Sequence, residues 1–165
     1  RKLGFMGFLS YNQLSDSDIM AVIAYLRSLP ADSGTGPGGD DLNILGVALL
    51  GSNIFPSAPP VEGVVTAPPP GATPEYGKYV ALLGDCSGCH GADMTGTPAG
   101  GFGPPPSPNP RPFVKTLTVE EFIQTMRAGV RPNGISFSDA MPWETASRMT
   151  DGDLAALYAY LTAAP

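Results

Sequence analysis

Apolar residues recur at helical spacing near both ends of the chain. The first set, at i, i+3, i+4 and i+7, is Ile19, Val22, Ile23 and Leu26. The second set, at equivalent spacing, is Leu154, Leu157, Tyr158 and Leu161. Each set follows a candidate capping residue, Ser15 or Thr150, with an aspartate three positions later. The pattern predicts two one-faced helices, the first of which ends before Pro30.

The two predicted helices are also similar in sequence. Shifting the chain by 135 residues aligns 14–30 with 149–165 and gives seven identities in 17 positions. The same shift places Met6 on Met141. This internal repeat predicts that residues 1–30 are the C-terminal piece of a domain related to residues 74–165. The alternatives are that 1–30 complete a domain supplied elsewhere or pack on the intact domain.

Residues 31–73 differ from both flanking regions. They are rich in Gly and Pro, which is typical of a linker. Within them, residues 42–50 form an apolar run that is far too short to cross a membrane. We expect a short helix packed on a domain; the alternative is a docking patch for a partner subunit or a membrane surface.

Two further helices are predicted between the linker and the C-terminus. Thr73 followed by Pro74 is a favourable helix start, and the helix leads directly to Cys86. A second helix is predicted over 118–128, where Met126 falls on the apolar face and is expected in the core. No alternating strand pattern appears near the cysteines.

Composition and charge exclude some functions. Of the 165 residues, only 15% are charged, and the net charge is −6. An acidic chain lacks the basic face that phosphate contacts require, so a nucleic-acid partner is not expected. No stretch approaches 20 consecutive apolar residues, so no transmembrane helix is expected. The chain contains only two Cys and one His.

All three of these residues fall in one motif, Cys86-Ser87-Gly88-Cys89-His90. The pattern CxxCH is the attachment signature of a c-type haem: two thiols reach the porphyrin vinyl groups, and the histidine is the proximal iron ligand. A structural zinc site needs four protein ligands, and no second pair is available. A thioredoxin-like site needs a βαβ setting, and a disulfide would leave His90 unexplained.

The second axial ligand follows from the methionines. Bis-His ligation within the chain is impossible, and Met is the usual alternative. Met94 is too close to His90, Met126 is expected in the core, and Met149 is expected to pack at the last helix. Met141, in an irregular segment before Pro142, is therefore the candidate distal ligand. The alternative is that Met141 is a buried filler and the sixth position is open.

Residues 74–165 resemble a class I cytochrome c domain, most closely the multihaem cytochrome subunits of bacterial membrane-bound dehydrogenases and related dihaem cytochromes. The matching segments are 75–79, 86–91, 140–143 and 153–161. The resemblance implies an all-α fold, with helices around a covalent haem. It also implies that Gly77 lets the first helix cross the last closely, against Tyr158 or Tyr160. It implies that the Pro104 carbonyl accepts a hydrogen bond from His90. It also makes Trp143 and Arg111 candidates for hydrogen bonds to the haem propionates.

The expected function is electron transfer outside the cytoplasm, in the periplasm or on the outer membrane face, as part of a multihaem cytochrome or respiratory or dehydrogenase complex. One covalent haem is expected in 74–165, and Met6 is the candidate ligand of a second. The expected partners are a donor dehydrogenase or quinol-oxidising complex and an acceptor oxidase or cytochrome, with a membrane-associated complex among the candidates. The alternatives are a haem enzyme, such as a dihaem peroxidase, and a docking subunit of a membrane complex.

Overall fold

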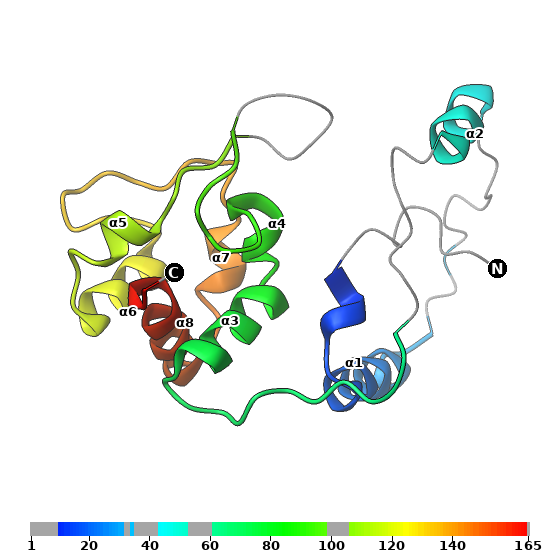
Figure 1. Ribbon diagram of the computed structural model, residues 1–165, viewed down its shortest axis with the longest axis horizontal. Helices are drawn as coiled ribbons and strands as arrows, with labels where there is room; N and C mark the ends of the chain where they lie inside the picture. Colours follow the sequence, from blue (N-terminus) through cyan, green and yellow to red (C-terminus); the bar gives the residue numbers. More distant parts are fainter. Residues whose placement is uncertain (1–9, 32–33, 35–42, 53–60, 99–105, 165) are drawn as a thin grey trace. The chain divides into compact units, whose positions relative to one another are not determined.

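The computed structural model describes residues 10–31, 34, 43–52, 61–98 and 106–164. The chain divides into two compact units, residues 1–66 and 67–165, and each is considered separately (Figure 1). Within the described residues the secondary structure is helical, with only two isolated β-bridges. The predicted Met6 and Pro104 lie outside these residues. No helix in the described part of the chain is long and apolar enough to span a membrane.

The first unit contains η2 (Ser10–Gln13), α1 (Asp16–Ser28) and α2 (Ile44–Gly51). The predicted cap of α1 is confirmed, because Ser15 Oγ accepts a hydrogen bond from Asp18 N at 3.1 Å. The short helix expected in the apolar run is also present as α2. Its described apolar side chains are exposed rather than packed, and Ile44 is 90% exposed. The packing of this helix on a domain stays a prediction.

The second unit shows six helices in its described residues, including those expected after Thr73, over 118–128 and at the C-terminus. They are α3 (Pro74–Leu83), α4 (Cys86–His90), α5 (Arg111–Val114), α6 (Val119–Ala128), α7 (Trp143–Ala146) and α8 (Asp151–Thr162). Threonine caps three of them: Thr73 before α3, Thr118 before α6 and Thr150 before α8. Each side chain satisfies a backbone N–H of the first turn that has no partner within the helix.

The crossing of α3 and α8 organises this unit (Figure 1). A Cβ placed on Gly77 would collide with the Ala156 carbonyl and would lie 2.8 Å from Tyr160 Cβ. Only glycine permits this close approach. The expected role of Gly77 is confirmed, with Tyr160 rather than Tyr158 as the aromatic neighbour.

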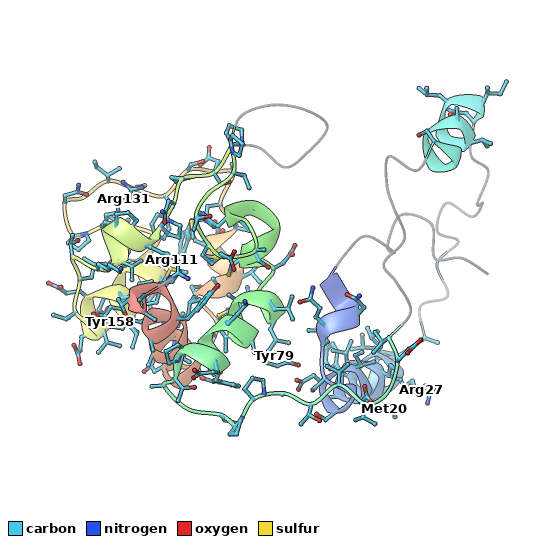
Figure 2. The ribbon with its side chains drawn as sticks, in the orientation of Figure 1. Met20, Arg27, Tyr79, Arg111, Arg131 and Tyr158 are labelled. Atoms are coloured by element: carbon cyan, nitrogen blue, oxygen red, sulfur yellow. The ribbon has the colours of Figure 1, made fainter. Side chains whose placement is uncertain are left out.

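The core lies between α8 and the helices packed on it. Leu154 is completely buried, and Met126 of α6 is buried as predicted. Phe122 lies 5.8 Å from the Tyr158 ring, measured between ring centroids. The Tyr158 hydroxyl donates to the Leu117 carbonyl at 2.8 Å, so α8 is joined to the segment before α6 (Figure 2). These contacts form the scaffold on which α4 and the segment containing Met141 are held.

Candidate haem site

The two cysteines lie on α4, immediately after a sharp reversal of the chain. Asp85 has a left-handed backbone conformation, with φ at 52°, and separates α4 from α3. Cys86 and Cys89 are both free and half-buried. Burial, with the Asp85 carboxylate as the next cause, raises the pKa of the Cys86 thiol to about 11. Cys86 therefore keeps its proton at neutral pH.

The chain after α4 folds back on the end of that helix. Gly96 N donates to the His90 carbonyl at 2.8 Å, and Thr97 Oγ1 donates to the Cys89 carbonyl at 2.9 Å. Thr97 and Ser107 then pair through their backbones in an isolated bridge. This pairing brings the residue after Ser107 beside the imidazole.

The His90 ring is held by Pro108. His90 Nδ1 lies 2.8 Å from the Pro108 carbonyl oxygen. A carbonyl can only accept, so Nδ1 is the donor, and in the neutral ring Nε2 then keeps its lone pair. The expected partner, Pro104, lies outside the described residues; the described partner of His90 is Pro108, four positions later in the sequence. The proline-rich run indicated that a proline carbonyl would accept from His90, but the sequence did not indicate which proline supplies it.

Arg111 has a structural role. It is buried at the start of α5; its Nε donates to the Asp93 carbonyl at 3.0 Å and its Nη1 donates to the Tyr160 carbonyl at 2.9 Å. Nη1 also lies 3.3 Å from the carbonyls of Leu161 and Ala163. Because the last carbonyls of a helix lack partners and carry partial negative charge, Arg111 stabilises the end of α8 (Figure 2). A contact of Arg111 with a propionate stays a prediction.

Met141 and Trp143 lie at the start of α7. Met141 is half-buried and packs against the core, and its carbonyl accepts from Trp143 N at 2.8 Å. The Trp143 ring lies against Gly129, where a Cβ would collide with the ring. Gly129 also ends α6 with a φ of +66°. Glycine is therefore required here for two reasons: the left-handed backbone conformation and the close approach of the Trp143 ring. A hydrogen bond from Trp143 to a propionate stays a prediction.

The other methionines of the second unit, Met94, Met126 and Met149, pack in or beside the core. Met94 is 3% exposed and belongs to the core cluster. Met149 is half-buried and packs against this cluster. It also lies close to Gly84, where an added Cβ would stand 2.5 Å from Met149 Cε. The partly buried residues that pack on this cluster include Cys86, a predicted haem-attachment residue, and Met141, the predicted distal ligand.

The donor set suits a covalently attached haem. It comprises two reduced thiols, an imidazole whose Nε2 lone pair is available, and a half-buried thioether. No group of three or more His, Cys, Asp or Glu that could hold a metal ion occurs in the described residues. A zinc site of the usual ligands therefore has no counterpart in this part of the chain.

Comparison with known proteins agrees with this donor set. Residues 75–161 match the family model described as cytochrome c oxidase, cbb3-type, subunit III. The cytochrome c subunit of alcohol dehydrogenase (quinone) from Gluconacetobacter polyoxogenes is 38% identical over 96 residues, which are 52% of this chain and 20% of that protein. The cytochrome subunit of fructose dehydrogenase from Gluconobacter japonicus is 30% identical over 96 residues, again 52% and 20%.

A third relative matches over a longer part of the chain. This protein, a nicotinate dehydrogenase component from Pseudomonas putida, is 33% identical over 134 residues, which are 74% of this chain and 11% of that protein. No solved structure matches the chain at a significant level. The chain spans 20% of the length of the first relatives described above.

The family match confirms the all-α cytochrome c fold and the resemblance to cytochrome subunits of dehydrogenases. It also identifies the domain as an electron carrier rather than a unit that transforms a substrate, and it implies haem c as the cofactor. The match covers 75–161, more than half of the 165 residues. The chain therefore belongs to the c-type cytochrome family described as cytochrome c oxidase, cbb3-type, subunit III.

Proposed function

We propose that this chain transfers single electrons on one haem c attached through Cys86 and Cys89, with His90 and Met141 as the axial ligands. The bound haem supplies an iron that alternates between the ferrous and ferric states. The protein provides the ligands, an apolar surrounding and a fixed ligand geometry. The observation that carries the proposal is the 2.8 Å contact between His90 Nδ1 and the Pro108 carbonyl oxygen. His90 lies on α4, the helix that also contains both free thiols.

That contact does two things for a metal ligand. It fixes the tautomer, so that Nε2 is the nitrogen available to the iron. It also fixes the rotation of the ring, because Pro108 follows the Thr97–Ser107 bridge and cannot move independently of it. A hydrogen-bonded imidazole is a more basic ligand than a free one, which favours tight coordination in both oxidation states.

Methionine as the sixth ligand suits an electron carrier. A thioether raises the reduction potential relative to a second imidazole. The half-burial of Met141 and its packing on the core support a ligand that stays in place during the redox cycle. The backbone bond from Trp143 N to the Met141 carbonyl supports the same arrangement, because it ties this residue to α7.

The decisive experiment replaces the methionines one at a time in the haem-loaded protein. Met141→Ala is expected to abolish the far-red charge-transfer band of a methionine-ligated ferric haem and to lower the midpoint potential. Met149→Leu is the matched control, because Met149 is also half-buried and packs on the same cluster. Met149→Leu should keep the band. Loss of the band in the control, and its retention in Met141→Ala, would refute the assignment.

The same spectra distinguish an electron carrier from a haem enzyme. A peroxidase-like enzyme needs an open sixth position and a distal acid or base. The carboxyl candidates on α6 are exposed, and Glu121 Oε2 already accepts from Thr118 N at 2.8 Å. We expect a low-spin haem that binds cyanide poorly. A high-spin spectrum with rapid cyanide binding would favour the enzyme instead.

The first 30 residues are proposed to end a second cytochrome c-like domain. The 135-residue shift places Ala21 and Tyr25 of α1 on Ala156 and Tyr160, the two residues that meet Gly77. Tyr160 is 8% exposed, whereas Tyr25 is 64% exposed. The docking residues are therefore present on α1 without a helix packed on them in the described part of the chain. The matching occupant is a helix like α3, with a glycine at the crossing and a CxxCH motif after it.

In that domain Met6 would be the distal ligand, as its alignment with Met141 suggests. The test is the haem iron content and mass of the protein as purified from its natural source. More than one covalent haem per polypeptide is expected. A natural polypeptide that extends beyond Arg1 but carries a single haem would contradict this part of the proposal.

Location and partners follow from the haem attachment and the relatives. Attachment through CxxCH takes place outside the cytoplasm, which supports the periplasm or the outer membrane face. The relatives named as subunits of alcohol and fructose dehydrogenases support a dehydrogenase or a quinol-oxidising complex as donor and an oxidase or another cytochrome as acceptor. Copurification of the haem-containing chain with a dehydrogenase would support this; a free periplasmic monomer would not. The exposed apolar side chains of α2 are a candidate contact in such a complex.

A further inference from the structure

The segment between α6 and Met141 holds one arginine in a fixed backbone position. Arg131 N donates to the Ile135 carbonyl at 2.9 Å, and the Arg131 carbonyl accepts from Gly134 N at 2.9 Å. Phe137 N donates to the Gly129 carbonyl at 2.8 Å and closes the turn. These backbone hydrogen bonds fix the position of the Arg131 Cα, from which the side chain extends.

The guanidinium of Arg131 packs on an aromatic ring, and one of its nitrogens lacks a hydrogen-bond acceptor among the described residues. Its Cζ lies 5.2 Å from the centroid of the Phe113 ring, a cation–π contact between this loop and α5 (Figure 2). Arg131 Nε is buried and has no hydrogen-bond partner among the described residues. Nor does the side chain form an ion pair with a described carboxylate. Arg131 as a whole is half-buried, but a buried N–H without an acceptor is unfavourable, and next to a cationic group the acceptor that fits best is an anion.

Other cations of this unit are already bound to the protein. Arg111 is bound to carbonyls at the end of α8. Arg127 donates to the Ser147 carbonyl and pairs with Asp151 at 2.7 Å. Lys78 lies 3.9 Å from Asp93. Arg131 stands apart from these three because its buried Nε lacks a partner in the described part of the chain.

We propose that Arg131 Nε donates to a propionate carboxylate of the haem, an inference that rests on the proposed function. The surroundings favour this anion: Phe113 and Phe137 pack on the same cluster as Met141 and Cys86. Haem brings two carboxylates to a chain of net charge −6, so a nearby cation is needed to offset them. The guanidinium also disfavours the extra positive charge of the ferric iron, which raises the midpoint potential.

The test compares four haem-loaded proteins: wild type, Arg131→Gln, Arg131→Lys and Arg148→Gln. Arg148 is exposed and lies in the same unit, so its removal changes the net charge equally without removing a buried donor. The readouts are the midpoint potential and the resonance Raman bending band of the propionates, which reports hydrogen bonding to their carboxylates. Arg131→Gln is expected to lower the potential more than Arg148→Gln and to shift the propionate band. Arg131→Lys is expected to keep most of the potential but still shift the band.

Each outcome decides the proposal. Variants that keep the wild-type propionate band and the potential of Arg148→Gln would overturn it. If Arg131→Gln does not retain haem, the band of Arg131→Lys carries the decision. A wild-type potential that responds to added phosphate, with the response lost in Arg131→Gln, would show that a free anion occupies the place and would also overturn it. Failure of the proposed function is distinguishable, because it removes the covalent haem or the low-spin spectrum from the wild type itself.

Discussion

Replacement of Gly77 by alanine tests the helix crossing on which the haem domain depends. The added Cβ would collide with the Ala156 carbonyl and would stand 2.6 Å from its carbonyl carbon. It would also stand 2.8 Å from Tyr160 Cβ. These atoms belong to the backbone or lie next to it, so rotation of a side chain cannot relieve the overlap. The helices α3 and α8 have to separate.

The magnitude follows from two opposing effects. Overpacking of a well-packed contact costs about 1–3 kcal/mol, and a contact with backbone belongs at the upper end. Alanine in a helix interior gains about 1 kcal/mol over glycine. The expected net loss is therefore about 2 kcal/mol in the free energy of unfolding. With a urea dependence of about 2 kcal/mol per molar, the unfolding midpoint should fall by about 1 M.

The assay is urea unfolding of the ferric holoprotein, followed by far-ultraviolet circular dichroism and by haem absorbance. Gly152→Ala is the matched control, since Gly152 is also helical but a Cβ placed there would make an ordinary contact with Thr150 Oγ1 at 3.7 Å. That control should be neutral or more stable by about 0.5–1 kcal/mol. A Gly77→Ala protein as stable as the wild type would refute the close crossing.

Three further substitutions test other parts of the domain. Thr118→Ala removes the cap of α6 and should cost about 1 kcal/mol in thermal unfolding, with an unchanged haem spectrum; no loss would mean that the capping box is not formed in solution. Leu154→Ala empties a completely buried position and should cost about 2–5 kcal/mol in urea unfolding, and a loss below about 1 kcal/mol would contradict its burial. Arg111→Met should cost about 2–4 kcal/mol because it leaves carbonyls at the end of α8 without a donor. Its midpoint potential should stay near the wild-type value if the role of Arg111 is structural, whereas a large fall would support the propionate role.

The features that could be predicted from sequence are those encoded by neighbouring residues. The caps at Thr73 and Thr150 need only a hydroxyl and a backbone N–H a few positions away. The haem motif is equally local, because Cys86, Cys89 and His90 occupy one short helix. Local chemistry and helical spacing were therefore enough to predict α3, α6 and α8, together with the haem motif.

The features that could not be predicted depend on residues far apart in the chain. The His90 partner depends on the Thr97–Ser107 bridge, which selects Pro108 from several prolines with equivalent carbonyls. Arg111 reaches the carbonyls of Tyr160 and Leu161 at the far end of the domain sequence, so its structural role appears only when α5 packs on α8. In both cases the sequence contained the right chemical group without indicating its partner.

The two related helices separate what local sequence determines from what packing determines. A side-chain hydroxyl caps both α1 and α8. On α8, Ala156 and Tyr160 meet Gly77, and α1 has the same two residue types at the aligned positions. Their helical state is therefore encoded independently of their surroundings. Burial is not: it appears on α8, where α3 supplies a glycine, and is lacking on the described face of α1. Since exposed apolar surface is unfavourable in water, the proposed second domain would stabilise α1 by covering it with an equivalent helix.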